Sequence, residues 1–408
     1  MKYIEKLLNG AEVKWMPLGE VFETRNGYTP SKANNDFWTK GDIPWFRMED
    51  IRDSGRLLND SIQHITPQAI KGKGLFRANS IIMATTATIG EHALLLVDAL
   101  ANQRFTNFQI RKSLSERISP MFAFYYFFVL GEWCKSNVNT SSFPSVDMAR
   151  LMKQLFPIPP LAVQEEIVRI LDKFTTQEAE LEAELDCRKR QYEYYRNQLL
   201  SLDVINSKGN LNNVEVVTLG EIGTFVRGSG LQKKDFTATG VGCIHYGQIY
   251  TYYGTCADKT KSFVSYEFAQ KARKAKTGDL IIATTSENDD DVCKAVVWLG
   301  DDEIAVSSDA CFYTHKMNPK YVAYYFQTDS FQKQKRSFIT GTKVRRVNAT
   351  DLAKIKIPIP PLAEQQRIVS ILDKFEALTT SISEGLPKEI ALRRKQYEYY
   401  RNQLLSFA

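Results

Sequence analysis

The feature that most constrains this chain is an eleven-residue segment, Gln191–Ser201, which returns letter for letter at Gln396–Ser406. Both copies read Gln-Tyr-Glu-Tyr-Tyr-Arg-Asn-Gln-Leu-Leu-Ser. Chance does not repeat eleven residues that include three tyrosines, so the chain contains an internal duplication. With 408 residues it is long enough for two or three domains, each with a core of its own.

Shorter landmarks repeat upstream of each copy, in the same order. Leu18-Gly-Glu returns 201 residues later as Leu219-Gly-Glu, and the apolar runs that begin at Ile81 and Leu280 both end in Ala-Thr-Thr. Runs of this composition are typical of buried strands, here with hydroxyl side chains at their tips. The other expected elements are turns at Asn26-Gly27 and Gly228-Ser-Gly230, and helices that begin at Pro120 and Pro319.

Each globular stretch ends in Ile-Pro-Pro-Leu-Ala, at 158–162 and 359–363, where the paired prolines favour an extended exit. A short amphipathic helix that contains Ile-Leu-Asp-Lys-Phe is expected next in both copies. A long helix with a heptad seam follows, because its seam residues recur at alternating spacings of four and three. The seam contains Leu181, Leu185, Tyr192, Tyr195 and Leu199 in the first copy and Leu386, Ile390, Tyr397, Tyr400 and Leu404 in the second, with Arg188 and Arg393 as polar seam positions.

Two equal seams in one chain can pack on each other. Because a globular domain returns the chain between them, we expect an antiparallel coiled coil, with a parallel pair or pairing between two chains as alternatives. A helix of roughly 25 residues rises about 38 Å and would hold two domains at a fixed spacing. The second copy has four additional residues near Ser383, where Gly385 and Pro387 mark a new helix start.

The predicted fold class is therefore α+β: two globular α/β domains separated by two long helices that form an antiparallel coiled coil, with a pseudo-two-fold internal repeat. The expected regions are a first globular domain at 1–158, a central helical region at 159–212, a second globular domain at 213–359 and a C-terminal helical region at 360–408. The helices are nearly identical, whereas the globular domains share only landmarks. We interpret this as one task that the helices perform twice and two different tasks of one kind in the domains. Drift after duplication is the alternative, although it does not explain why the helices were spared.

The Ile-Pro-Pro-Leu-Ala exit, the Ile-Leu-Asp-Lys-Phe helix and the Gln-Tyr-Glu-Tyr-Tyr-Arg repeat together resemble the specificity subunit of type I restriction–modification systems, over the whole chain. The resemblance implies a non-catalytic DNA-recognition subunit, in which each globular domain is a target-recognition domain for one half of a bipartite, asymmetric site. It also implies helices that set the spacer and dock two copies of an adenine methyltransferase subunit, and restriction subunits that join for cleavage. S-adenosylmethionine, ATP and magnesium would belong to those partners, and this chain would carry no cofactor.

The search for catalytic motifs favours a binding protein over an enzyme. The Asn/Asp-Pro-Pro-Tyr/Phe motif of a methyltransferase is missing, because Asn318-Pro319 is followed by Lys320, and the sequence contains no phosphate-binding P-loop. The four histidines are scattered without the spacing of metal ligands, so we expect no metal site. The acidic run Glu287–Asp291 lacks the spacing of a calcium loop and is better explained as a solvated surface loop.

Composition favours a cytoplasmic protein. Six cysteines without a Cys-x-x-Cys pair, together with an N-terminus that lacks a signal peptide, indicate reduced thiols. The longest apolar run, Met121–Leu130, is too short for a bilayer, which takes roughly 20 residues, and reads as a buried core helix. The formal net charge of +6 permits nucleic-acid binding without proving it.

DNA recognition needs cations for phosphates and forked or amide side chains for base edges. In the second domain Gly341–Arg346 reads as a flexible loop with three cations in four residues, and it is the best predicted contact. Its counterpart, Ser142–Val146, is uncharged, which suits a different DNA sequence. For every candidate, the alternative is a solvated surface residue or a cap. The candidates are Arg25, Arg47, Lys71, Lys73, Arg77, Gln103 and Arg104 in the first domain and Arg227, Lys233, Lys234, His245, Gln248, Lys343, Arg345 and Arg346 in the second.

Tyr194 and Tyr399 lie off the seam, and exposed aromatic side chains on a packed helix are candidates for docking a partner. Thr85, Thr86 and Thr88 at the first strand tip are either phosphate contacts or turn caps. The main alternative to a DNA-reading subunit is a duplicated coiled-coil scaffold whose domains bind proteins. An enzyme with an unrecognised site is the third hypothesis.

Overall fold

The computed structural model describes residues 3–139, 144–208, 214–381 and 384–407. The chain forms two compact units: unit 1 contains residues 1–180 and 390–408, and unit 2 contains residues 181–389. The eleven-residue repeats are therefore exchanged between the copies. The first repeat, Gln191–Ser201, belongs to the unit of the second globular domain, and the second repeat, Gln396–Ser406, to that of the first. The helical regions do not form compact units of their own.

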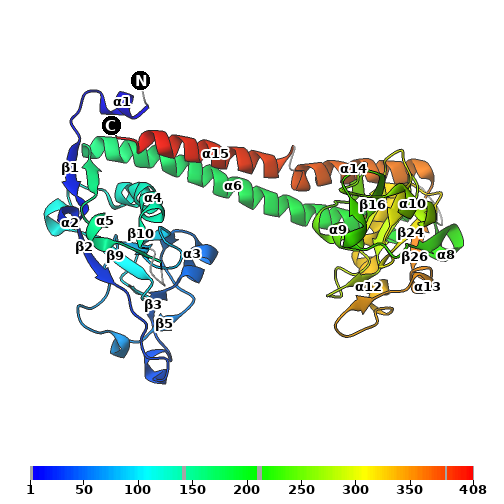
Figure 1. The fold of residues 1–408 in the computed structure, drawn as a ribbon, viewed down its shortest axis with the longest axis horizontal. Helices are drawn as coiled ribbons and strands as arrows, with labels where there is room; N and C mark the ends of the chain where they lie inside the picture. Colours follow the sequence, from blue (N-terminus) through cyan, green and yellow to red (C-terminus); the bar gives the residue numbers. More distant parts are fainter. Residues whose placement is uncertain (1–2, 140–143, 209–213, 382–383, 408) are drawn as a thin grey trace. The chain divides into compact units, whose positions relative to one another are not determined.

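The elements of unit 1 begin with a helix that the sequence reading did not anticipate, α1. They are α1 (Tyr3–Leu8), β1 (Lys14–Pro17), α2 (Leu18–Val21), β2 (Phe22–Asn26), β3 (Ile43–Phe46), α3 (Met48–Ser54), β4 (Leu57–Leu58), β5 (His64–Ile65), β6 (Ile81–Ala84), β7 (His92–Leu95), β8 (Leu100–Ala101), β9 (Phe105–Ile110), α4 (Pro120–Ser136), β10 (Val138–Asn139), β11 (Ser145–Val146), α5 (Met148–Leu151) and β12 (Leu155–Ile158), with short 3₁₀ turns at Asn35–Phe37, Pro67–Ala69 and Lys112–Leu114. The long helix α6 (Leu161–Leu199) begins in unit 1 and continues into unit 2 (Figure 1).

The elements of unit 2 repeat most of this order and include additional short ones. They are α7 (Leu202–Lys208), β13 (Glu215–Thr218), α8 (Leu219–Ile222), β14 (Gly223–Arg227), a 3₁₀ turn at Lys233–Asp235, β15 (Phe236–Thr237), β16 (Val241–Ile244), α9 (Tyr246–Thr251), β17 (Cys256–Ala257), β18 (Ser262–Val264), α10 (Tyr266–Lys271), β19 (Lys274–Ala275), β20 (Leu280–Ala283), β21 (Thr285–Ser286), β22 (Ala295–Trp298), β23 (Ile304–Val306), β24 (Ala310–His315), α11 (Pro319–Phe326), α12 (Asp329–Arg336), β25 (Arg345–Arg346), α13 (Ala349–Leu352), β26 (Lys356–Ile359) and α14 (Leu362–Thr380). The last helix, α15 (Leu386–Leu404), begins in unit 2 and continues into unit 1.

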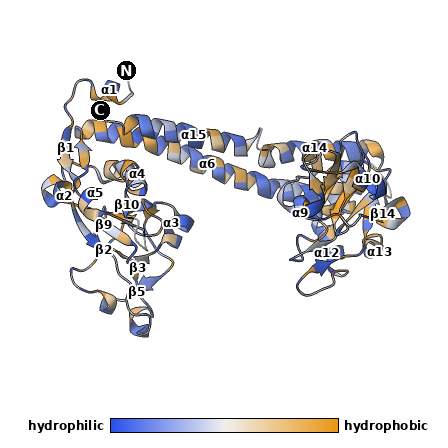
Figure 2. Cartoon of the chain, in the orientation of Figure 1, coloured by the Kyte–Doolittle hydropathy of each residue, from blue (hydrophilic) through white to orange (hydrophobic). Residues whose placement is uncertain are grey.

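The central sheet of each unit has five strands in equivalent order, β2-β9-β6-β7-β4 in unit 1 and β14-β24-β20-β22-β17 in unit 2. The predicted apolar runs are its strands β6 and β20, and both are buried along their whole length. The reason is that both faces of the sheet are covered. Ile81 and Met83 pack with α4, while Ile82 and Ala84 pack with residues of the small sheet β5-β3-β8. Figure 2 shows the hydrophobic residues gathered on such strands, and the long helices largely hydrophilic.

Two glycines that the sequence analysis placed in turns have another function. Strand β2 continues through Asn26, and a Cβ on Gly27 would lie 2.4 Å from the carbonyl oxygen of Ala101. The matching Gly228 would place its Cβ 2.4 Å from the carbonyl oxygen of Val306. Both turn predictions are therefore wrong. Glycine is needed at these positions because two backbone segments approach each other too closely for any side chain.

The exit helices differ between the two copies. The sequence predicts a short helix followed by a long one in both, but α6 is a single helix of 39 residues. In the second copy α14 ends at Thr380 and α15 begins at Leu386, as the glycine and proline there predict. Gly385 has a φ of +82°, which glycine adopts at low cost, and Pro387 suits a first helical turn. Part of the insertion, residues 382–383, lies outside the described residues.

The two long helices run antiparallel in unit 1. Phe174 of α6 stacks on Tyr400 of α15 with ring centroids 5.2 Å apart, and one turn further along α6 Glu178 pairs with Arg394. Unit 2 has the matching stack, Phe375 on Tyr195, with ring centroids 5.4 Å apart. The sequence predicts that the two seams pack on each other. Three of the seam tyrosines, Tyr400 in unit 1 and Tyr192 and Tyr195 in unit 2, stack on the phenylalanine that ends the Ile-Leu-Asp-Lys-Phe segment of the other copy.

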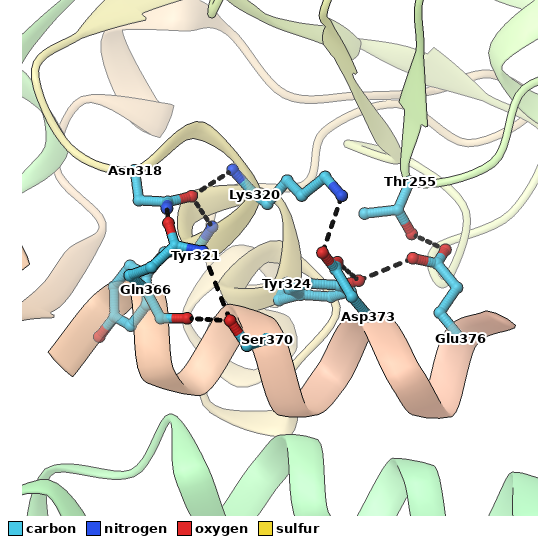
Figure 3. Close-up of polar contacts among 9 residues, drawn as sticks. All are labelled: Thr255, Asn318, Lys320, Tyr321, Tyr324, Gln366, Ser370, Asp373 and Glu376. Carbon is cyan, nitrogen blue, oxygen red and sulfur yellow. Dashed lines mark hydrogen bonds and ion pairs between the residues drawn. The ribbon is translucent and has the colours of Figure 1, made fainter. Parts of the chain in front are cut away.

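A polar network fastens the second globular domain to α14 (Figure 3). The Tyr324 hydroxyl lies 2.6 Å from a carboxylate oxygen of Asp373 and 2.7 Å from one of Glu376. Lys320 donates to Asp373 at 2.9 Å, and the Thr255 hydroxyl donates to Glu376. In unit 1 the corresponding contact is a hydrogen bond from Tyr125 to Asp172 of α6, at 2.5 Å. The contact between globular domain and helix therefore involves more charged side chains in unit 2 than in unit 1.

Candidate nucleic-acid interface

In unit 2 three of the predicted contacts, Lys233, His245 and Gln248, line one cavity of about 790 Å³. His245 precedes α9, and its Nδ1 accepts the backbone N–H of Gly247 at 3.2 Å. Burial, and then the nearby charge of Lys233, lower the pKa of His245 below its usual value, which favours the neutral ring. The Gln248 amide is engaged at both ends, because it accepts the N–H of His245 and donates to the Ser262 hydroxyl. Its observed role is to cap the helix.

The basic segment Gly341–Arg346 closes as a hairpin beside this cavity. Strand β25 pairs with β21, so that Arg345 lies opposite Ser286 and Arg346 opposite Thr285. Arg345 is held by the carboxylate of Asp289 at 2.8 Å and donates to the carbonyl oxygen of Gly341 at 2.6 Å. The segment that the sequence predicts as a flexible loop is therefore a turn held in place by hydrogen bonds and an ion pair. Such a guanidinium is oriented for one geometry, which suits a base edge better than a variable phosphate.

The other two cations of the hairpin are less constrained. Arg346 lies 4.0 Å from Asp309 at an exposed position. Lys343 is exposed, and no ion pair of its side chain is found among the described residues. Exposed, weakly paired cations suit phosphates, because such contacts need charge more than fixed geometry.

The acidic run Glu287–Asp291 is exposed, but hydrogen bonds from a buried lysine hold its backbone in place. Lys335 of α12 is fully buried, and its Nζ donates to the carbonyl oxygens of Asp290 at 3.0 Å and Val292 at 2.9 Å. Burial lowers the pKa of Lys335, so these hydrogen bonds are needed to keep the ammonium group in place. The sequence reading missed Lys335, because a lysine in a helix gives no sign that it is buried.

In unit 1 another three predicted contacts, Arg25, Lys73 and Arg77, line a cavity of about 690 Å³ beside β2. The guanidinium of Arg25 lies over the ring of Phe76, 4.7 Å from its centroid, and burial lowers the pKa of Arg25. No carboxylate pairs with Arg25 among the described residues. Arg77 lies 3.5 Å from Asp98. Two further lining residues, Gln109 and Arg111, were not predicted.

The remaining candidates lie outside these two cavities. Arg47 is half-buried 3.8 Å from Glu49, and Lys71 is exposed. Gln103 is exposed and accepts a hydrogen bond from Thr29, and Arg104 is exposed. Arg227 donates to the carbonyl oxygen of Ser308 at 2.9 Å, and Lys234 is exposed in a 3₁₀ turn. These side chains remain predicted contacts without a shared geometry.

The Ala-Thr-Thr tips bind a later segment of each globular domain through backbone hydrogen bonds. The carbonyl oxygen of Thr85 accepts the N–H of Val146 at 2.9 Å, and that of Thr284 accepts the N–H of Val347 at 3.1 Å. The Thr85 hydroxyl is already bonded to that of Thr106. These threonines thus serve the fold. Residues 140–143 of unit 1, among them Ser142 and Phe143 of the uncharged counterpart, lie outside the described residues.

The repeated helix segments complete the cores of the globular domains. Leu404 is buried against the core that contains α4, and Leu199 and Tyr192 are buried against the core that contains α11. The other seam residues differ in burial. Two are buried, Leu386 and Ile390, and three are half-buried, Leu181, Leu185 and Tyr397. The side chain of Tyr195 is exposed. Tyr194 and Tyr399, in contrast, are 60% and 61% exposed. Packing in the protein core therefore does not explain why tyrosine occupies these two positions.

Comparison with known proteins decides the family. The model of the type I restriction modification DNA specificity domain matches residues 11–186 and again 212–392. The chain belongs to the type I restriction–modification specificity subunits. Its similarity to the Escherichia coli EcoprrI specificity subunit is 50% identity over 233 residues, which cover 54% of this chain and 57% of that one. Another E. coli type I specificity subunit is 32% identical over 100% of this chain and 97% of its own length.

The specificity subunit also shares its fold with a solved structure. A chain from a structure of complex assembly and conformational transition of the type I R-M system is 16% identical, covers 96% of this chain and 97% of its own length, and gives a TM-score of 0.63. Family membership favours DNA specificity over the protein-binding scaffold. The described residues of this specificity subunit contain no cluster of three metal-ligating side chains. None of its described helices is long and apolar enough to span a membrane.

Proposed function

We propose that this chain is the non-catalytic DNA-recognition subunit of a type I restriction–modification complex, and that each globular domain reads one half of a bipartite, asymmetric site. The observation that carries the proposal is a difference at one place in the fold. Beyond the Ala-Thr-Thr tip, unit 2 presents the cationic hairpin of Lys343, Arg345 and Arg346, where the sequence of unit 1 is uncharged. Two domains with one framework and different contact side chains suit two different half-sites.

Within unit 2 we assign different contacts to the three cations. Arg345, oriented by Asp289, presents forked donors that match the acceptors of a guanine edge. Lys343 and Arg346 contact phosphates. In unit 1 we assign the corresponding task to Arg25, whose guanidinium is supported by Phe76 and lacks a carboxylate partner among the described residues.

The helices set the spacer and dock the partners in this proposal. The unbroken helix α6 supports a ruler, because a helix has a fixed rise per residue. The exposed Tyr194 and Tyr399 support two equivalent contacts with two methyltransferase subunits. S-adenosylmethionine, ATP and magnesium then belong to the methyltransferase and restriction subunits, and the assembly acts on double-stranded DNA in the cytoplasm.

Sequencing of methylated adenines in cells that express the chain with its methyltransferase tests the proposal. Arg345→Ala, or replacement of 341–346 by 140–145, should relax or change one half of the methylated site. Arg25→Ala should affect the other half. If both substitutions altered the same half, or if the methylated sites did not depend on this chain, the proposal would be wrong.

A further inference from the structure

Helix α12 of unit 2 connects the repeated segment of α6 to the cationic hairpin. Its first residue, Asp329, donates its backbone N–H to the side-chain oxygen of Asn197 at 2.8 Å, and the Asn197 amide donates to the carboxylate of Asp329 at 3.0 Å. The preceding residue of α6, Arg196, donates to the side chain of Gln327 at 3.2 Å, just before α12 begins. These hydrogen bonds fix the start of α12 against α6.

Packing in the domain core also holds α12. Phe331 is fully buried and stacks on Phe326 of α11, with ring centroids 4.1 Å apart. The hydroxyl of Thr328 accepts the N–H of Phe331 at 3.2 Å and so caps the helix. A short packed helix transmits a displacement from one end to the other, because its backbone hydrogen bonds keep its length and shape.

The chain leads from α12 directly into the cationic hairpin. Thr340, four residues after the helix ends, exchanges two backbone hydrogen bonds of 2.9 Å with Arg346. These bonds close the hairpin at the end nearest to the helix in the sequence. The last turn of α12 therefore sets where the hairpin begins.

The same last turn holds the loop that orients Arg345. The ammonium group of Lys335 donates to the carbonyl oxygens of Asp290 and Val292. The residue before Asp290 is Asp289, whose carboxylate binds Arg345 at 2.8 Å. Lys335 is fully buried, and no ion pair of its side chain is found in the described part of the chain. Such a buried charge costs stability, which an apolar side chain at a purely structural position would avoid.

Unit 1 has a different arrangement at the corresponding place. A single helix, α4, extends there, where unit 2 has α11 and then α12. Asn402, the counterpart of Asn197 in the second repeat, is exposed, and no hydrogen bond of its side chain is found among the described residues. The neighbouring Arg401 lies over the ring of Phe128, 4.4 Å from its centroid. Two identical segments therefore make different contacts, and in unit 2 these contacts reach the helix that precedes the hairpin.

We propose that α12 positions Arg345 for base recognition, and that Lys335 and Asn197 are positioning residues that act through this helix. Lys335 fixes the loop of Asp289, and Asn197 fixes the helix from which Lys335 extends. A forked guanidinium at a base edge tolerates little displacement, because both of its hydrogen bonds must form together. This inference rests on the proposed function, in which Arg345 reads a base of one half-site. It extends that recognition site from the exposed hairpin into the domain core and to the repeated helix.

DNA binding by the complex of this chain with its methyltransferase subunit tests the inference. The duplexes carry the methylated site, either unchanged or with one substituted base pair. Arg345→Ala identifies the base pair that Arg345 reads, because there the ratio of affinities for the unchanged and substituted duplexes should fall by about 10-fold or more. Lys335→Met keeps most of the side-chain volume without the ammonium group, and should lower the ratio at that base pair by about 5-fold. Discrimination in the other half-site should not change.

A double variant distinguishes positioning from a general effect on the fold. If Lys335 acts through Arg345, Lys335→Met should have no further effect on the ratio in a chain that already carries Arg345→Ala. An equal effect with and without Arg345 would overturn the inference. Thermal melting of each variant verifies folding. Should Lys335→Met unfold the chain, Asn197→Ala at its half-buried position decides the inference by the same comparison, with an expected loss of about 3-fold.

The matched control is Asn402→Ala, which removes the same side chain from the identical segment of the other repeat and should leave discrimination unchanged in both half-sites. A loss equal to that of Asn197→Ala would overturn the role of Asn197. If Arg345→Ala changed discrimination at no base pair, the proposed function of the hairpin would be contradicted and this inference would fail with it. If Arg345→Ala changed it but Lys335→Met and Asn197→Ala did not, this inference alone would be wrong.

Discussion

The two units use one framework but join their globular domains to the helices differently. In unit 1 the Tyr125–Asp172 hydrogen bond joins the domain to the unbroken α6. In unit 2 Tyr324 faces two carboxylates, and α14 ends before α15 begins. The stacked phenylalanine and tyrosine are the same in both. Duplication thus kept the apolar packing, where a small change leaves a void, and varied the polar contacts, which tolerate substitution at a joint near solvent.

The contact side chains differ most, and the largest effect is expected there. Lys343→Ala, Arg345→Ala and Arg346→Ala together should cost about 3 kcal/mol of DNA binding, since each contact contributes roughly 1 kcal/mol or more. The slope of log K against log salt should fall by about 2, because two phosphate contacts are lost. Fluorescence anisotropy at several salt concentrations measures both quantities. The control removes three exposed cations of the same unit, Lys271, Arg273 and Lys276, and an equal loss there would indicate nonspecific attraction.

The joints should respond unequally to loss of one hydroxyl. Tyr324→Phe removes the donor between Asp373 and Glu376 and should reduce the free energy of unfolding by about 2 kcal/mol, since hydrogen bonds to charged groups contribute roughly 1.5–3 kcal/mol. Tyr125→Phe breaks one such bond and should cost less. Denaturant titration followed by two-unit fitting compares them. Equal losses of unfolding free energy in the two variants would show that the additional charged residues of unit 2 do not strengthen this contact.

Acid should destabilise unit 2 through His315. Its Nδ1 accepts the N–H of Met317 at 3.2 Å, and burial lowers its pKa to about 4. The unfolded chain, with a histidine pKa near 6.5, therefore binds the proton more readily, and stability falls as pH drops from about 6.5 to 4, by up to roughly 1.4 kcal/mol per pH unit. His315→Asn keeps an acceptor without a titrating group. Melting temperature against pH should be flatter for this variant, and an unchanged slope would exclude His315 as its source.

The interrupted helix gives the smallest expected effect. Gly385→Ala requires a positive φ from alanine and places a Cβ 2.4 Å from the carbonyl oxygen of Ala377, so it should cost about 1 kcal/mol or somewhat more. Gly254→Ala is the control, because no atom lies within 4 Å of its added Cβ. Thermal melting distinguishes them. A neutral Gly385→Ala would mean that the break between α14 and α15 does not depend on that glycine.

Local patterns in the sequence predicted the elements well. The apolar runs at Ile81 and Leu280 are strands, Pro120 and Pro319 begin helices, and Gly385 marks the restart of the last helix. These predictions hold because an apolar run, a proline at a first helical turn and a glycine at a positive φ are each recognisable in a short stretch of sequence. The turns at Gly27 and Gly228 failed because the requirement for glycine comes from a distant strand.

Part of the candidate site was also accessible from the sequence. Six predicted contacts line two cavities, and the hairpin of Lys343, Arg345 and Arg346 has a defined geometry. Lys335 could not be found, since a polar residue in a helix is exposed by default and only tertiary packing buries it. The buried glutamines Gln164 and Gln365 did have a usable signal, because the Pro-Pro-Leu-Ala-x-Gln spacing occurs in both copies.

The sequence by itself determined that one helix segment occurs twice and that two diverged domains share a framework, because both follow from comparing one half of the sequence with the other. The tertiary structure decided which domain each repeat completes. The first repeat is packed with the second globular domain and the second repeat with the first. The heptad spacing fixes which side of a helix is apolar, but the partner of that side depends on contacts between residues more than 200 positions apart, such as Phe174 and Tyr400.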